Sequence, residues 1–259
     1  MAVAQLADVS LNYRLDGPET APVLLLSNSL GTDLSLWEPQ VSPLSQRFRL
    51  LRYDTRGHGG SAATPGPYTL DQLGLDAVAL LDHLGIAKAH VAGVSLGGMT
   101  AQWLAINAPA RVQKVVPCFT SAHIGNPEMW NQRIAAIQAQ GLGAVVEGVL
   151  ERWFTPAFHE SRPDEIERFR KMLQGMPKDG YCAAAAAVRD MDLRAQLGRI
   201  TAPTLVIAGL HDLSTPPAHG EAIAAGIKGA RCEKVEAAHI GNVEAAGAVT
   251  KLLLEFLSS

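Results

Sequence analysis

The stretch His90-Val-Ala-Gly-Val-Ser-Leu-Gly-Gly98 decides the fold, because an apolar run typical of a buried strand leads directly into a serine flanked by glycines. Residues 93–97 match the pattern Gly-x-Ser-x-Gly, and helical spacing follows until Pro109. A serine on such a tight turn has a strained backbone, and the glycines let strand and helix pass without Cβ clashes. The sequence therefore predicts a strand-turn-helix unit that presents the Ser95 hydroxyl at a helix N-terminus.

Short apolar runs alternate with helical patterns on both sides of this turn, which is typical of a doubly wound α/β domain with a largely parallel sheet. A helix is expected over residues 70–84, because Thr69 to Gln72 forms a capping box and Gly85 ends the pattern. In the first half of the chain, strands are expected over residues 3–6 and 11–15, which form a hairpin, and over 23–27, 48–53, 90–94 and 112–119.

The alternation stops between residues 120 and 198, where only helical patterns occur. Helices are expected there over residues 128–140, 142–154, 163–175 and 178–189, separated by Gly141, Pro156, Gly175 and Pro177. Strand signals return at 204–208 and 233–235, and a last helix is expected from Val243. The chain is thus predicted to form a core of residues 1–119 and 199–259 with a helical cap inserted at 120–198.

Composition excludes several classes of function. With 259 residues, 47% of them hydrophobic, the chain can bury a large core, so disorder is not expected. Its 22 basic residues are outnumbered by 25 acidic ones, which favours neither nucleic acid nor a membrane surface as a partner. No export signal or membrane span is visible, and Cys118, Cys182 and Cys232 lie too far apart in sequence for a metal knuckle or a disulfide framework. A cytoplasmic protein is expected.

A serine hydroxyl needs a base, and the base needs an orienting acid. Both follow later strands: Asp212 comes after 204–208, and His239 lies between the last strand and the last helix. Because the carboxyl ends of parallel strands meet at one edge of a sheet, Ser95, Asp212 and His239 are predicted to form a catalytic triad. Asp190 and Asp192, at the end of the cap, are the fallback acids. The remaining histidines are expected at surface or packing positions: His58, His83, His90, His123, His159, His211 and His219.

Attack by a serine leaves negative charge on the carbonyl oxygen, and backbone N–H groups can stabilise it. The predicted donors are the N–H of Leu96, after the nucleophile, and that of Leu30, in the loop after residues 23–27, with Ser29 as the alternative. Ser29 is also a candidate for contact with substrate.

Residues 54–61, Asp-Thr-Arg-Gly-His-Gly-Gly-Ser, combine charge and glycine after a predicted strand. We interpret them as a structural loop in which Asp54 pairs with Arg56. Neither these glycines nor those at 93–98 complete a dinucleotide fingerprint or a phosphate loop, so no cofactor and no metal are expected.

Over essentially its full length the chain resembles the α/β-hydrolase superfamily, and more narrowly the 3-oxoadipate enol-lactonases. The Asn-Ser-Leu-Gly loop is the most specific feature, since many relatives have His-Gly where this chain has Asn28-Ser29. The resemblance rests on Ser27-Asn-Ser-Leu-Gly-Thr32, Arg52-Tyr-Asp-Thr-Arg-Gly-His58, Gly93-Val-Ser-Leu-Gly-Gly-Met-Thr-Ala-Gln102 and Ala238-His-Ile-Gly-Asn-Val-Glu244. It implies the triad Ser95, Asp212 and His239, and a small enol-lactone bearing a carboxymethyl group as substrate, hydrolysed to 3-oxoadipate.

A substrate carboxylate needs a cation in its pocket, and the cap supplies candidates. Arg133 is the first choice because Trp130 lies three residues before it on the same predicted helix, so the two can form one wall; Arg152 beside Trp153 is the second. An alternative interpretation is that these arginines are solvated and both tryptophans only pack the cap onto the core.

Two other functions are compatible with these residues. A serine esterase, or a hydrolase that cleaves a C–C bond of a vinylogous diketone, would use the same triad on another small carbonyl substrate. A ligand-binding receptor on the same scaffold would have a broken triad, and the sequence shows none broken. Dehalogenases and epoxide hydrolases that use an aspartate nucleophile are disfavoured because residue 95 is serine.

Overall fold

The computed structural model describes residues 2–259, which form a mostly parallel sheet of eight strands in the order β1-β2-β4-β3-β5-β6-β7-β8. The β1–β2 and β2–β4 pairs are antiparallel and the other pairs are parallel. The predicted N-terminal hairpin and parallel sheet are therefore confirmed. The strands are β1 (Ala2–Gln5), β2 (Ser10–Asp16), β3 (Val23–Ser27), β4 (Arg49–Tyr53), β5 (Ala89–Val94), β6 (Val112–Cys118), β7 (Leu205–Gly209) and β8 (Arg231–Val235).

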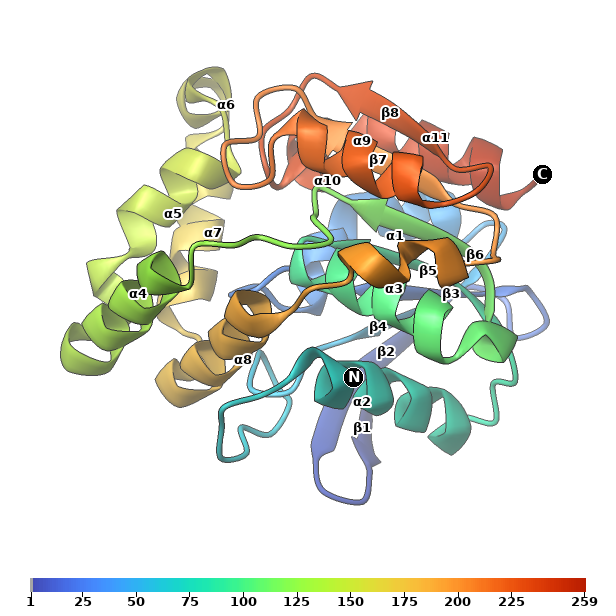
Figure 1. Ribbon diagram of the computed structural model, residues 1–259, viewed down its shortest axis with the longest axis horizontal. Coiled ribbons are helices and arrows are strands. Elements are labelled where there is room, and N and C mark those ends of the chain that lie inside the picture. Colours follow the sequence, from blue (N-terminus) through green and yellow to red (C-terminus); the bar gives the residue numbers. More distant parts are fainter. Residues whose placement is uncertain (1) are drawn as a thin grey trace.

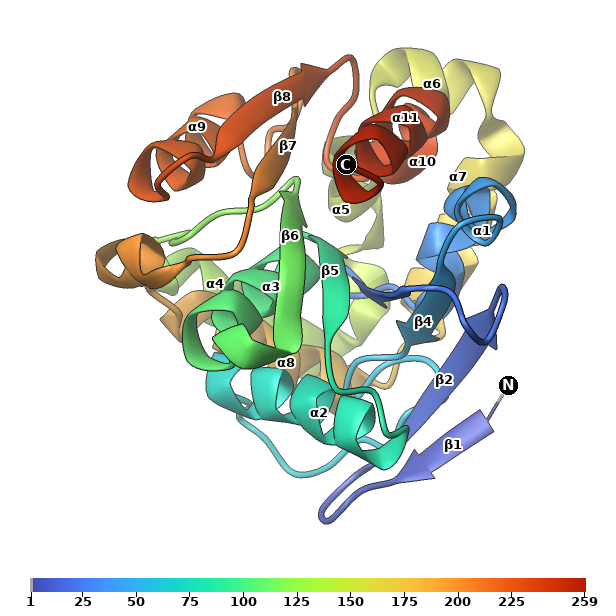
Figure 2. The same cartoon turned by 90° about the vertical axis from the view of Figure 1, so that its right-hand side faces the viewer.

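Helices cover both faces of the sheet (Figure 2). On one face lie α2 (Leu70–His83), α3 (Leu96–Asn107) and α9 (Pro217–Gly226), and on the other lie α1 (Glu38–Leu44) and α11 (Ala246–Leu257). Because both faces are covered, the central strands are continuous apolar runs, and Leu24, Leu25 and Leu26 of β3 are fully buried. This layered arrangement is the predicted α/β-hydrolase architecture.

The segment between β6 and β7 contains helices and, within residues 2–259, no strand. These helices lie together at one end of the molecule, beyond the sheet (Figure 1). They are α4 (Pro127–Gln140), α5 (Val146–Trp153), α6 (Pro156–Ser161), α7 (Pro163–Gln174) and α8 (Lys178–Asp190). The chain also contains short 3-10 helices: η1 (Leu34–Trp37), η2 (Pro109–Arg111), η3 (Leu142–Ala144) and η4 (Arg194–Arg199).

Two helices differ from the prediction. The helix expected over residues 142–154 is divided into η3 and α5 at Val145, where the backbone leaves the helical region. The expected C-terminal helix is likewise divided into α10 (Gly241–Glu244) and α11 at Ala245. Both breaks lie in stretches of low helix propensity, since Gly143 and Gly148 flank the first and Gly241 and Gly247 flank the second.

Helix α6 is absent from the prediction because a proline such as Pro156 also commonly separates two helices. Proline is favoured at the first position of a helix, and here it begins α6, with the Thr155 side chain capping it by accepting from the Phe158 N–H. Among the helices of residues 2–259, none has the length and apolar character that crossing a lipid bilayer requires.

Candidate active site

Ser95 occupies the strained turn predicted between β5 and α3. Its backbone angles are φ 56° and ψ −116°, a region that side-chain-bearing residues rarely adopt. The flanking glycines make the turn possible: a Cβ on Gly93 would lie 2.0 Å from the Gly97 carbonyl oxygen, and one on Gly97 would lie 2.2 Å from that of Ser27. The close approach of strand and helix therefore requires glycine at both positions, and it leaves Ser95 partly exposed to the cavity.

Ser95, His239 and Asp212 form one chain of hydrogen bonds. His239 Nε2 lies 2.9 Å from Ser95 Oγ, and His239 Nδ1 lies 2.8 Å from Asp212 Oδ2. The three residues come from the ends of β5, β8 and β7, and the aspartate and histidine are buried. In this order the imidazole can take a proton from the hydroxyl while the carboxylate holds its orientation.

Four hydrogen bonds hold the Asp212 carboxylate. Oδ1 accepts from the N–H groups of Ser214 and Thr215, each at 2.8 Å, and Oδ2 accepts from Thr215 Oγ1 at 2.8 Å in addition to facing His239. Burial acts to raise the pKa of Asp212, but attraction to His239 and these hydrogen bonds outweigh it and hold that pKa below its usual range. The group beside His239 is therefore a carboxylate anion at neutral pH.

A cavity of about 160 Å³ lies over Ser95, between the sheet and the inserted helices. Most of the site residues predicted from the sequence line it: Ser29, Leu30, Ser95, Trp130, Arg133, Trp153 and His239. Arg152 lines it as well, with an exposed side chain. The structure thus brings together residues from three loops of the sheet and two inserted helices, and it places Asp212 behind His239.

The predicted oxyanion donors come from two segments, the start of α3 and the loop after β3. Leu96 is the first residue of α3, where an N–H group has no partner within the helix. Leu30 lies in the loop after β3 and borders the cavity. That loop is held by Thr32, whose N–H and Oγ1 both donate to the Ser29 carbonyl oxygen, at 3.2 and 2.8 Å.

Two residues of α4 that line the cavity, Trp130 and Arg133, each carry a buried N–H donor. Trp130 Nε1 and Arg133 Nε are buried and have no hydrogen-bond partner among residues 2–259. The Arg133 guanidinium lies 5.2 Å from the centre of the Trp130 ring, as their helical spacing predicted, and it donates to the hydroxyl of Tyr181. No carboxylate of the described chain pairs with this arginine, so this wall of the cavity is positively charged.

The expected Asp54–Arg56 pair is wrong. Asp54 instead accepts from the N–H groups of Leu34 and Gly60, at 2.6 and 2.8 Å. Arg56 forms a double hydrogen bond with Asp76 of α2 and reaches Asp8 in the turn between β1 and β2. A buried guanidinium requires several acceptors at once, and these two carboxylates supply four oxygens, whereas N–H donors already occupy Asp54.

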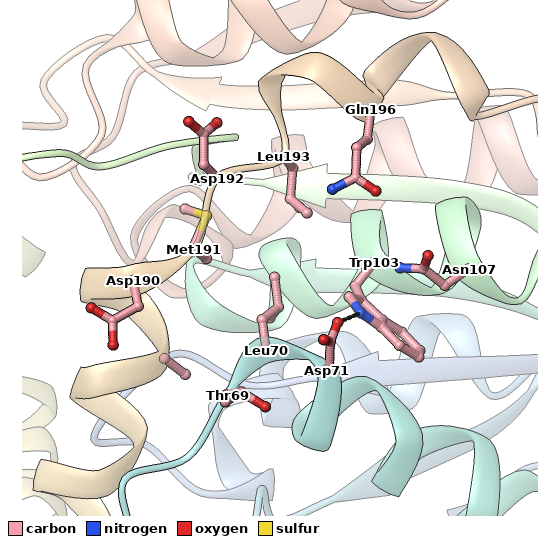
Figure 3. A pocket seen from close by; sticks show the side chains of 11 residues that line it. Thr69, Leu70, Asp71, Trp103, Asn107, Asp190, Met191, Asp192, Leu193 and Gln196 are labelled. Carbon is pink, nitrogen blue, oxygen red and sulfur yellow. Dashed lines mark hydrogen bonds between the residues drawn. The ribbon is translucent and has the colours of Figure 1, made fainter.

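Other predicted candidates lie away from the serine. Asp190 and Asp192 pair with Arg189 and Arg194 and border a different cavity, between α2, α3 and the end of α8 (Figure 3). There Asp71 accepts a hydrogen bond from Trp103 Nε1 at 2.5 Å, drawn as a dashed line in Figure 3. All three carboxylates of this second cavity are thus engaged by neighbouring side chains.

Three supporting residues were missed by sequence reasoning. His58 is fully buried and contacts the loop that carries Leu30, and Tyr181 holds Arg133. Glu244 accepts from the Ala238 N–H beside His239 at 2.8 Å and from Thr155, so it connects the histidine loop to the segment between α5 and α6. The signal for these roles in the sequence is weak. His58 and Glu244 lie in two of the stretches that resemble the enol-lactonases, but the residues they contact are remote from them in sequence.

The chain is similar to known hydrolases along its length. The family described as alpha/beta hydrolase fold matches residues 22–246. The chain is 43% identical to 3-oxoadipate enol-lactonase 2 of Acinetobacter baylyi, over 92% of this chain and 89% of the relative, and 38% identical to enol-lactonase 1 of that organism, over 91% and 88%. Its structure matches that of the enol-lactonase from Burkholderia xenovorans LB400 with a TM-score of 0.98, at 44% identity and full coverage of both chains.

Proposed function

The chain belongs to the α/β-hydrolase fold family and, within it, to the 3-oxoadipate enol-lactonases, and we propose from this premise that it opens the ring ester of 3-oxoadipate enol-lactone with water. The observation that carries the proposal is one cavity lined both by Ser95, which is hydrogen-bonded to His239, and by Arg133, which forms no ion pair with a carboxylate among residues 2–259. Such a cavity suits a small ester that bears a carboxylate. Because the reaction is a hydrolysis, the substrates are the lactone and water, and the product is a single dicarboxylate.

The first half of the reaction forms an acyl-enzyme. Ser95 Oγ attacks the lactone carbonyl carbon while His239 Nε2 takes the hydroxyl proton, and the N–H groups of Leu30 and Leu96 stabilise the resulting oxyanion. The ring C–O bond then breaks and His239 returns the proton to the enolate oxygen. Since the leaving group stays attached to the acyl chain, ring opening releases no second product, and the enol becomes a ketone.

The second half restores the serine. Water attacks the Ser95 ester while His239 takes a proton from it, and collapse of the second tetrahedral intermediate returns that proton to Ser95 Oγ. The Asp212 carboxylate stabilises the imidazolium at both stages, because it accepts from Nδ1 throughout. The acid product is 3-oxoadipate.

We assign the carboxymethyl group of the substrate to the wall of Trp130 and Arg133. Both side chains present an N–H donor that is buried without a partner among residues 2–259, and a buried donor of this kind is costly unless a ligand satisfies it. Arg133 is preferred over Arg152 because its guanidinium is held between the Trp130 and Tyr181 rings, whereas Arg152 is exposed. Ser29 and Trp153 complete the lining around the lactone ring.

Replacing the cation tests this assignment. We expect Arg133→Ala to raise KM for the enol-lactone about tenfold to a hundredfold, because one charge-assisted hydrogen bond to the substrate is lost. The effect on kcat should be smaller. Steady-state rates on p-nitrophenyl acetate, which has no carboxylate, should stay near those of the wild type. Arg152→Ala is the matched variant and should change KM little. An equal loss on both esters would argue against a carboxylate site at Arg133.

Residues 120–198 are proposed to act as a cap that closes this cavity, because they carry Trp130, Arg133 and Trp153. No group of three His, Cys, Asp or Glu side chains in the described chain is placed to hold a metal ion. The cytoplasmic location and the lack of nucleic-acid and membrane partners stay predictions from the sequence.

Initial rates on three substrates test the proposed function. We expect kcat/KM to be highest for 3-oxoadipate enol-lactone, lower for p-nitrophenyl acetate and lowest for a meta-cleavage product, whose C–C bond must be broken. A preference for the aryl ester would favour a general esterase, and a preference for the meta-cleavage product would favour a C–C bond hydrolase. Either result would replace the enol-lactone as the substrate.

A further inference from the structure

His58 lies directly beneath the loop that is proposed to form half of the oxyanion hole. It is fully buried, and its Nε2 lies 3.0 Å from the backbone N of Gly31, the residue after Leu30. Its Nδ1 lies 3.2 Å from the carbonyl oxygen of Arg56. The ring thus bridges two loops that follow neighbouring strands, β3 and β4.

The partners of His58 define its tautomer. A backbone N–H can only donate and a backbone carbonyl can only accept, so Nε2 carries the lone pair and Nδ1 carries the proton. Burial lowers the pKa of His58 to about 4, which keeps the ring neutral at neutral pH and the lone pair available. The imidazole therefore serves as a fixed acceptor for the Gly31 N–H.

Gly31 is the residue in this loop that most needs such a partner. Its φ of +80° lies in the left-handed region, and a Cβ there would lie 2.6 Å from Leu173 of the cap, so the position requires glycine. Glycine also has the greatest backbone freedom, so the hydrogen bond from its N–H to His58 limits rotation of its peptide plane. Rotation of that plane would turn the adjoining backbone of Leu30, which borders the cavity.

Arg56, which supplies the other partner, is itself immobilised. Its guanidinium is bound by Asp76 at 2.8 Å through Nε and by Asp8 at 3.1 Å, and it is 2% exposed. The loop of residues 54–61 is therefore held rigidly by the ion pairs of Arg56, and it fixes the position of the His58 ring. This role explains why the loop combines charged residues with glycines.

We propose that His58 is a positioning residue of the reaction: by accepting the Gly31 N–H, it holds the loop that aims the Leu30 N–H at the oxyanion. This inference rests on the proposed serine-hydrolase function. His58 is fully buried and is not among the residues that line the cavity, whereas Ser29 and Leu30 of the loop it contacts are, so it acts on the substrate through that loop. Its contribution is made in the transition state, where the charge on the carbonyl oxygen is greatest.

Two polar substitutions separate this role from simple packing. Glutamine can place its side-chain oxygen where Nε2 lies, whereas asparagine reaches only as far as Nδ1. For His58→Asn we expect kcat on p-nitrophenyl acetate to fall about tenfold to a hundredfold, with KM changed less than about threefold. The inhibition constant of trifluoroacetone, whose adduct with Ser95 carries an oxyanion, should rise by a similar factor. His58→Gln should restore both quantities to within about threefold of the wild type.

His90 provides the matched control. It is also a buried histidine whose pKa burial lowers to about 4, and it lies on β5 with its ring against Phe48. His90→Asn and His90→Gln should lower the melting temperature as the His58 variants do while leaving kcat and the trifluoroacetone constant unchanged. Equal activities of His58→Asn and His58→Gln, or a fall in kcat without a rise in the inhibition constant, would overturn the proposal.

Two further measurements keep the test decisive. If His58→Asn does not fold, amide hydrogen exchange of Gly31 in the wild-type enzyme replaces it: protection of this amide supports the proposal, and exchange at the rate of an exposed loop overturns it. A wild-type enzyme that hydrolyses p-nitrophenyl acetate but not the enol-lactone would overturn the substrate proposed above. In that case, the kcat values of the His58 and His90 variants on p-nitrophenyl acetate would still decide the role of His58.

Discussion

Ser95→Ala is expected to lower kcat on the enol-lactone at least about a thousandfold, because the hydroxyl oxygen that forms the acyl-enzyme is removed. The residual rate would come from water attacking a lactone held against the Leu30 and Leu96 N–H groups. Binding should persist, since the Trp130 and Arg133 wall is untouched. Rates at saturating substrate and the dissociation constant of 3-oxoadipate measure the two effects separately.

Ser121→Ala is the control for this variant. Ser121 is also buried, but its hydroxyl binds His219 and the backbone of His123, at the entrance to the inserted segment. Its replacement should leave turnover close to that of the wild type. Near-normal turnover by Ser95→Ala would disprove the assignment of the nucleophile.

Asp212→Asn is expected to lower kcat by a factor on the order of 10⁴ through a change of tautomer at His239. Two backbone N–H groups, of Ser214 and Thr215, donate to Oδ1, so the amide oxygen must take that place. The amide nitrogen then faces His239 Nδ1 and donates to it. The ring proton moves to Nε2, which can no longer take the proton of Ser95.

Thr215→Val separates this effect from mere loss of a hydrogen bond. It removes the hydroxyl that donates to Asp212 Oδ2 and leaves the carboxylate in place. We expect a loss of about tenfold or less, comparable to one ordinary hydrogen bond. If Asp212→Asn and Thr215→Val lost the same activity, the carboxylate would not be acting through the histidine tautomer.

Sequence patterns predicted those parts of the fold that depend on local periodicity. Strand 23–27 was predicted to the residue, because the apolar run of residues 23–26 is typical of a strand that is buried on both faces. The expected start of α2 is also confirmed, since Thr69 accepts from the Gln72 N–H as a capping residue does. The turn at Ser95 was predictable for a similar reason: only glycine tolerates the contacts measured at Gly93 and Gly97.

The partners of buried polar groups were not predictable in this way. Arg56 binds Asp76 and Asp8, which are far from it in sequence, rather than nearby Asp54. Likewise, Glu244 reaches Thr155 across a separation of 89 residues. The periodicity of apolar residues predicts which face of a helix or strand is buried. It does not predict which side chain of another element contacts that face.

The sequence alone determined the succession of strands, the helices on either side of the serine turn, that turn itself, and the occurrence of an acid and a histidine after later strands, because backbone geometry imposes these patterns locally. Only the tertiary structure decided that His239 reaches Ser95 and Asp212 at 2.9 and 2.8 Å, that Arg133 faces the same cavity, and that His58 supports Gly31. Such contacts depend on how sheet, loops and inserted helices pack in three dimensions, and hydrogen bonds form only between groups that packing brings within about 3 Å.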